Sequence, residues 1–259
     1  MFLFTPPVRG ACCWSWWRDI SPGGGISDFI IIQMILLAAD TSGKNGSLAL
    51  ARIHERGERS PAVEILELVP LEGGTFSAQL VPQISALLTN HKLGKKDLGG
   101  FVVVSGPGSF TGLRVGLAAI KALAEVLHKP IAAVSRLEAV ARSSSLPGRV
   151  ISAIDAGRGD CYAGEYELGS NVRVVAERLL TRDEFLSEYR NAVIVTPDSV
   201  LADAARRVGM TVEQVPDPRG DVIARLGWGK IQAGQTTSPD EMEANYIRRS
   251  DAEIFAKRS

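Results

Sequence analysis

The stretch Ser105–Arg114, SGPGSFTGLR, decides the fold because it joins the clearest strand pattern of the chain to its clearest helix pattern. Before it lies Phe101–Val104, an apolar and β-branched run that is typical of a strand buried on both faces. After it, Ser109 or Thr111 can cap a helix whose pattern continues to about His128. The order predicts a strand, a tight glycine turn and a helix.

The glycine turn itself allows two interpretations. Gly106 and Gly108 permit a sharp turn and a close approach of the backbone to another group, and the start of the helix would suit an anion. The spacing matches neither a Walker loop, which ends in Gly-Lys before a serine or threonine, nor a dinucleotide fingerprint, because Thr111 stands at the third glycine position. A phosphate-binding loop and a tight turn without a ligand therefore both remain open.

The composition limits the classes of protein to which this chain can belong. The chain has 259 residues, of which 45% are hydrophobic, so it can bury the core of one large domain or of two lobes. Lysine plus arginine equals aspartate plus glutamate, 29 each, so any contact with RNA is expected to be local or shared with a partner.

Cysteine usage indicates the redox compartment of the protein, and hydropathy indicates whether a segment could cross a membrane. Three cysteines, with Cys12 and Cys13 adjacent, do not make a disulfide framework, and a reducing cytoplasm fits best. The longest apolar run, Phe29–Ala39, contains Gln33 and is shorter than the roughly 18–20 residues that a membrane helix needs. The sequence therefore predicts no transmembrane segment.

The chain divides into four parts by pattern. Residues 1–33, rich in proline, glycine and tryptophan without a period, are expected to be a disordered and dispensable extension, with Met34 as the working start. Residues 34–145 predict a first lobe with strands at 35–39, 47–53, 62–69, 101–104 and 131–134, and helices at 75–90, 112–128 and 136–144.

The second half is less regular. Residues 146–235 predict a smaller lobe with strands at 150–154, 161–167 and 192–196, and helices at 182–189, 198–208 and 219–233. Residues 236–259 form a C-terminal tail whose run Asn245–Ser250 has no assignable pattern.

Two predicted helices carry unusually few charges. The helix at 75–90 contains none, and the charged or titratable residues of the helix at 112–128 fall within an arc of roughly 60°. We expect both helices to be buried on two sides and to form a docking surface, unless the chain's own second lobe or termini cover them. The side chains expected at this interface are Leu80, Ile84, Leu87, Leu88, Leu113, Gly116, Leu117 and Ile120.

Candidate catalytic groups are sparse. The three histidines are far apart and match no metal-binding spacing, and Cys161 is interpreted as a buried thiol within a strand. Asp40 and Asp155 each end a predicted buried strand, where a carboxylate can reach a metal-bound phosphate or can cap its own turn. Together with Gly106 and Gly108 they are the candidate nucleotide contacts.

Four motifs together resemble the TsaB (YeaZ-like) family, from about Ile35 to the C-terminal tail. They are Leu37–Ser42, Gly106–Gly116, Ile154–Ala156 and Tyr246–Arg249. The resemblance implies an α/β, two-lobed, actin-like and sugar-kinase-like ATPase fold with a ribonuclease-H-like N-terminal lobe. It also implies a cytoplasmic, non-catalytic scaffold that dimerises with the enzyme TsaD, with TsaE as a third member, in biosynthesis of threonylcarbamoyladenosine in tRNA.

The resemblance implies further that tRNA is met only through the complex, and that the chain has no metal or cofactor of its own. ATP or ADP at the complex interface and a homodimer in isolation remain open. Two departures concern small-ligand contacts: Phe76–Gln79 lacks the family's histidine, and Gly157 stands where an arginine often follows Ala156. The alternative function is a nucleotide-dependent phosphotransferase of the same superfold.

Overall fold

The computed structural model describes residues 32–56, 59–169 and 172–247. The predicted extension 1–33 lies outside these ranges except for Ile32 and Gln33, which are the first two residues of strand β1. The regular part of the chain therefore begins two residues before Met34. Cys12 and Cys13 also lie outside the described residues.

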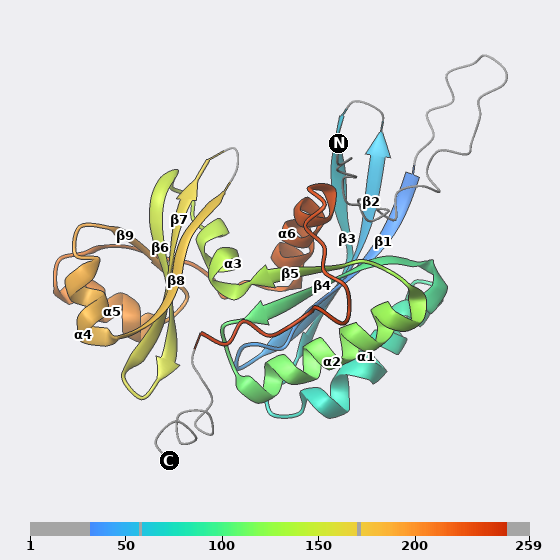
Figure 1. Cartoon of the computed structure of the whole chain (residues 1–259), viewed down its shortest axis with the longest axis horizontal. Helices are drawn as coiled ribbons and strands as arrows, with labels where there is room; N and C mark the ends of the chain where they lie inside the picture. Colours follow the sequence, from blue (N-terminus) through green and yellow to red (C-terminus); the bar gives the residue numbers. More distant parts are fainter. Residues whose placement is uncertain (1–31, 57–58, 170–171, 248–259) are drawn as a thin grey trace, which may run out of the picture. The chain divides into compact units, whose positions relative to one another are not determined.

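The first half of the chain forms a mixed sheet of five strands (Figure 1). The strands are β1 (Ile32–Asp40), β2 (Gly46–Arg56), β3 (Arg59–Leu71), β4 (Leu98–Gly106) and β5 (Ile131–Ser135), in the order β3-β2-β1-β4-β5. The meander β1-β2-β3 is antiparallel, whereas β4 lies parallel to both β1 and β5. A short 3-10 helix, Lys95–Asp97, leads into β4.

Both faces of this sheet are covered, as the apolar run in β1 predicts. Leu37 and Ala39 pack toward α1 (Phe76–Asn90) and α2 (Phe110–Leu127), while Leu36 and Ala38 pack toward α6 (Gly220–Gln232) on the opposite face. Alternate side chains of a strand point to opposite faces, so a fully apolar strand needs two covering layers.

A second sheet repeats the strand order of the first. Its strands are β6 (Gly148–Gly157), β7 (Asp160–Leu168), β8 (Arg173–Thr181), β9 (Val193–Thr196) and β10 (Thr211–Gln214), in the order β10-β9-β6-β7-β8. The first three strands are again antiparallel neighbours and β9 again runs parallel to β6. One face packs on α4 (Arg182–Glu188) and α5 (Ser199–Arg207), and the other packs on α3 (Arg136–Arg142).

The element order predicted for the first lobe, β-β-β-α-β-α-β-α, matches the structure. The prediction for the second lobe missed β8 and β10 and assigned residues 219–233 to that lobe. Helix α6 instead packs on the first sheet through Ile223, Ala224 and Trp228, which is a correction to the predicted division at 146–235. None of the described helices is long and apolar enough to cross a membrane.

Candidate functional site

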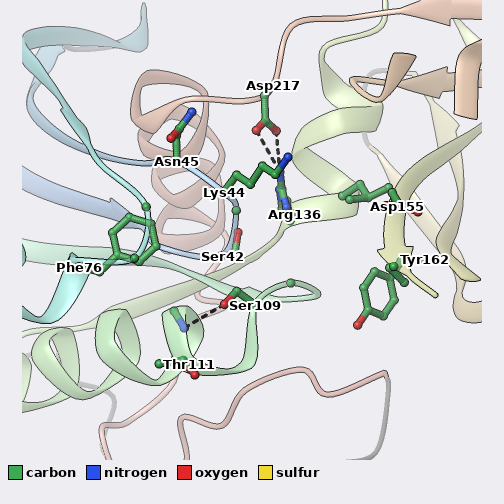
Figure 2. A pocket seen from close by; sticks show the side chains of 18 of the residues that line it. Ser42, Lys44, Asn45, Phe76, Ser109, Thr111, Arg136, Asp155, Tyr162 and Asp217 are labelled. Atoms are coloured by element: carbon green, nitrogen blue, oxygen red, sulfur yellow. Dashed lines mark hydrogen bonds and ion pairs between the residues drawn. The ribbon is translucent and has the colours of Figure 1, made fainter. Parts of the chain in front are cut away.

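A cavity of about 840 Å³ lies among the loop after β1, the glycine turn before α2 and the turn between β6 and β7 (Figure 2). Its charged lining comes from five side chains, Lys44, Arg136, Asp155, Asp198 and Asp217. Of the four predicted nucleotide contacts, Gly108 and Asp155 line this cavity, whereas Asp40 and Gly106 are not among its lining residues.

Asp40 caps the loop that follows its own strand. Its carboxylate Oδ1 accepts hydrogen bonds from the backbone amide of Ser42 at 2.8 Å and from the Ser42 hydroxyl at 2.6 Å. The residue is only 4% exposed. Burial raises the pKa of the Asp40 carboxyl, against the opposing effects of Arg136 and Ser42. Of the two interpretations left open for Asp40, the structure supports the turn-capping one.

The glycine turn is filled by the chain itself. A Cβ on Gly108 would lie 2.3 Å from the Ser42 carbonyl oxygen, and a Cβ on Gly106, whose φ is +132°, would lie 2.7 Å from the Asn245 carbonyl oxygen. The Ser109 amide donates to the Ser42 carbonyl at 2.8 Å, and the Ser109 hydroxyl accepts from the amide of Gly112 at 3.3 Å. The close approach that glycine permits is therefore made by backbone, which supports the tight turn rather than a phosphate loop.

Asp155 differs from Asp40 because its carboxylate is exposed. The Asp155 amide donates to Asp198 Oδ2 at 2.7 Å, and its own carboxylate lies 3.8 Å from Arg182 Nη2. Asp40 is the last residue of β1 and Asp155 lies two residues before the end of β6, so the two acids have similar places in the repeated topology but different environments.

Arg136 is the cation deepest in the cavity wall. Its Nη2 donates to both carboxylate oxygens of Asp217, at 2.9 and 3.0 Å, and its buried Nε has no hydrogen-bond partner among the described residues. Arg136 directly follows β5, so it lies, like Asp40 and Asp155, at or near the carboxyl end of a strand. That position is the signal by which the sequence could have revealed it.

These lining residues do not fit a bound polyphosphate. Asp217 already neutralises Arg136, Asp155 lies 3.8 Å from Arg182, and Lys44 is the one further cation among the described lining residues, which also include the carboxylate of Asp198. A bridging divalent cation would need a cluster of ligands, and the described residues contain no group of three or more His, Cys, Asp or Glu that could hold a metal. His54 lies on β2, and His91 lies at the end of α1. Each forms a hydrogen bond with a glutamate rather than belonging to a metal site.

The eight predicted interface residues lie in the core of the first sheet. Seven of them belong to its main apolar cluster and have at most 7% of their surface exposed, and they are Leu80, Ile84, Leu87, Leu88, Leu113, Leu117 and Ile120. The eighth, Gly116, is buried against Thr41, whose Oγ1 would lie 2.3 Å from an added Cβ. Apolar spacing marked the face that packs on the sheet, so this choice of residues is corrected.

The outward face of the same two helices is uncharged and open. Val81 on α1 is 63% exposed and Val126 on α2 is 69% exposed. The other small or apolar residues with exposed side chains are Ala78, Pro82, Ala86, Ala118 and Ala122, and they are bordered by Val115, Ala119 and Leu123, which are half-exposed and also pack against the main apolar cluster. We call this set, with Val81 and Val126, the outer face of α1 and α2. The helices themselves lie against each other (Figure 1).

The charged side of α2 is contacted by the C-terminal segment. Lys121 Nζ donates to the Met242 carbonyl at 3.0 Å, and Arg114 Nε donates to the Tyr246 hydroxyl at 3.2 Å. The expectation that a terminus covers part of these helices is thus met on the polar side, and the uncharged outer face stays uncovered by the described residues. Docking at the two helices remains a prediction, now with different residues.

Comparison with known proteins places the chain among tRNA-modification proteins. A family model described as "TsaD: tRNA N6-adenosine threonylcarbamoyltransferase" matches residues 73–203. The "tRNA threonylcarbamoyladenosine biosynthesis protein TsaB" of Haemophilus influenzae is 33% identical over 232 residues, which are 83% of this chain and 94% of that protein. The protein of the same name from Bacillus subtilis is 37% identical over 135 residues, 52% of this chain and 56% of that protein.

A solved structure supports the fold. "YeaZ from Pseudomonas aeruginosa" matches with a TM-score of 0.64 at 22% identity, over 82% of this chain and 99% of that one. The predicted fold class, an α/β, two-lobed, actin-like and sugar-kinase-like architecture with a ribonuclease-H-like first lobe, is confirmed.

Proposed function

This chain belongs to the TsaB family of tRNA threonylcarbamoyladenosine biosynthesis proteins, and we propose that it acts there as the non-catalytic scaffold that binds a TsaD enzyme. The chain takes part in the biosynthesis of threonylcarbamoyladenosine in tRNA. In the proposed complex TsaD carries out the transfer to adenosine, TsaE is a further member, and tRNA contacts this chain only through the assembly.

The observation that carries the proposal is the outer face of α1 and α2. Exposed valines such as Val81 and Val126 within a surface that lacks charge are typical of the centre of a protein interface rather than of a solvated helix. Exposed small residues such as Ala118 and Ala122 would allow helices of a partner to approach closely.

The match to the TsaD family model supports the choice of partner. Residues 73–203 include both α1 and α2, so a TsaD-type protein would carry an equivalent helix pair on an equivalent sheet. Two related chains can then pair face to face through the same surface, as the subunits of two-fold symmetric dimers do. The same geometry allows a homodimer of this chain when TsaD is absent.

The proposal that catalysis belongs to the partner rests on the described side chains. Cys161 is completely buried, Asp40 is engaged by Ser42, and the cavity does not fit a polyphosphate. A nucleotide, if it takes part, would then be held at the interface with TsaD. The alternative of a phosphotransferase acting alone gains no support from the glycine turn.

One experiment separates these functions. The purified chain and TsaD are mixed, and their masses are measured by light scattering after size-exclusion chromatography, with and without ATP. The scaffold predicts a 1:1 or 2:2 complex, while the isolated chain shows negligible ATP hydrolysis. Two separate peaks together with ATP turnover by the isolated chain would favour the phosphotransferase.

A further inference from the structure

The run Asn245–Ile247, which has no pattern in the sequence, belongs to a segment that contacts both sheets (Figure 1). After α6 the Thr237 amide donates to the Ile131 carbonyl on β5 at 2.9 Å. Met242 then enters the apolar cluster between the first sheet and α2, where it is only 3% exposed. The segment is thus anchored on the first sheet before it reaches Asn245.

Asn245 makes polar contacts to both halves of the molecule. Its backbone amide donates to the Ser105 carbonyl at the end of β4, at 2.7 Å. Its side-chain Nδ2 donates to Glu177 Oε2 on β8, at 2.8 Å. The Asn245 carbonyl fills the space that Gly106 leaves open, because a Cβ there would lie 2.7 Å away.

Glu177, which accepts the hydrogen bond from the Asn245 side chain, also contacts two other strands. Its other oxygen, Oε1, accepts hydrogen bonds from the hydroxyls of Ser135 and Tyr166. Burial, together with the charge of Glu177, raises the pKa of Tyr166, so this hydroxyl remains a donor. The carboxylate therefore joins β5, β7 and the C-terminal segment at one point, and hydrogen bonds to a charged acceptor are among the stronger ones in proteins.

The residues beyond Asn245 extend the attachment. Tyr246 packs on Phe110 with ring centroids 5.0 Å apart, and Arg114 lies 3.7 Å over the same Phe110 ring. Ile247 packs against the apolar cluster of the second sheet, whereas Met242 belongs to that of the first. Six residues of chain thus connect two separate cores.

We propose that residues 237–247 are a strap that fastens the second sheet to the first, with Asn245 as its latch. The asparagine is suited to this role because its backbone donor holds Ser105 while its side-chain donor holds Glu177. An aspartate at the same position would keep the backbone contact and would place a second carboxylate against Glu177. The strap lies within one chain and does not depend on the proposed partner.

The test uses the full-length chain alone, with amide hydrogen exchange followed by mass spectrometry. Asn245→Asp should make amides of residues 242–247 exchange at least about tenfold faster, and should also loosen the 131–137 connection through Ser135, because the latch bond is lost. Strands β1 and β6 should keep their protection. Asn191→Asp, the same change at an exposed turn of the second sheet, is the matched control and should alter neither segment.

A rescue variant distinguishes the latch from general damage. In the double variant Asn245→Asp with Glu177→Gln, Oε1 still accepts from Ser135 and Tyr166, while the new amide donates to the new carboxylate. Exchange in residues 242–247 should return to within about twofold of the parent. Unchanged exchange in the single variant, or a double variant that exchanges as fast as the single one, would overturn the proposal.

If Asn245→Asp loses its circular dichroism signal and is therefore unfolded, the proposal is tested with Asn245→Ala. This variant removes the side-chain donor without adding a charge. The strap predicts faster exchange confined to residues 131–137 and 242–247 with both sheets intact. Global unfolding of this variant as well would mean that the segment is an integral part of the core, and the proposal would be wrong.

Discussion

The backbone amide of Ser109 donates a hydrogen bond of 2.8 Å to the backbone carbonyl of Ser42. This bond closes the loop after β1 onto the first turn of α2, and the Thr41 hydroxyl adds a second bond of 2.7 Å to the Gly112 carbonyl. The glycine turn therefore holds the loop after β1 against the start of α2. Two backbone amides that a phosphate loop would offer to a ligand, those of Ser109 and Gly112, are hydrogen-bonded within the chain.

Gly108→Ala should destabilise the folded chain. The new methyl group would lie 2.3 Å from the Ser42 carbonyl oxygen, which is backbone and cannot swing away. We expect a loss of about 1–3 kcal/mol in the free energy of unfolding, measured by urea denaturation.

Gly229→Ala is the control for that substitution. Gly229 lies exposed within α6, and an added Cβ meets nothing within 4 Å, so alanine should stabilise the helix by up to about 1 kcal/mol. A Gly108→Ala variant as stable as the parent would mean that the turn has room for a ligand.

Asp40→Asn should change how stability depends on pH. Because burial raises the pKa of Asp40 in the folded chain, the stability that this carboxyl contributes is full at low pH and is lost as the pH rises through its folded-state pKa. Asparagine keeps the acceptor for Ser42 and does not ionise. The parent should therefore gain stability relative to the variant as the pH is lowered through the folded-state pKa of Asp40 toward the ordinary value of an aspartate.

Urea unfolding at several pH values measures this difference, with Asp240→Asn at an exposed position as the control. A parent that instead loses stability relative to Asp40→Asn on acidification would show that the ionised carboxylate is favoured in the fold. That result would revive the interpretation of Asp40 as a ligand for a metal-bound phosphate.

Periodicity predicted the first lobe well because its elements are long and strongly apolar. The same reasoning missed β8, whose run Arg173–Thr181 interrupts its apolar residues with charges, and β10, which has only four residues. Edge strands of this kind expose one side and need no regular alternation. The second sheet repeats the strand order of the first, so an expectation of this repeat would have predicted both missed strands.

The sites were harder to predict because contacts between distant segments decide them. Sequence spacing correctly found that α1 and α2 lack charge, but the regular apolar positions such as Leu117 mark the inner face. The partners of Gly106 and Gly108 come from Asn245 and Ser42, far away in sequence. A glycine pattern reports a close approach without naming what approaches.

Cys161 should resist alkylation in the folded chain. Its side chain is fully buried in β7, and burial raises the pKa of the thiol to about 12, so the reactive thiolate is scarce. Iodoacetamide at pH 8 should label Cys161 only after urea unfolding, as peptide mass spectrometry can follow. Rapid labelling of this cysteine in the native chain would contradict its assignment as an inert core thiol.

The central claim is that the outer face of α1 and α2 binds TsaD, and Val126→Glu tests it most directly. The Val126 side chain is 69% exposed, so the isolated variant should fold with nearly the melting temperature of the parent. In the complex the same carboxylate would be buried without a partner, which costs several kcal/mol. Val200→Glu on α5, at a 59% exposed valine outside the outer face, is the matched control.

The decisive measurement is the dissociation constant for TsaD of the parent and of both variants, by isothermal titration calorimetry, with folding checked by circular dichroism. The account predicts that Val126→Glu weakens binding by at least about a hundredfold while Val200→Glu binds as the parent does. A folded Val126→Glu variant that binds TsaD as tightly as the parent would contradict it.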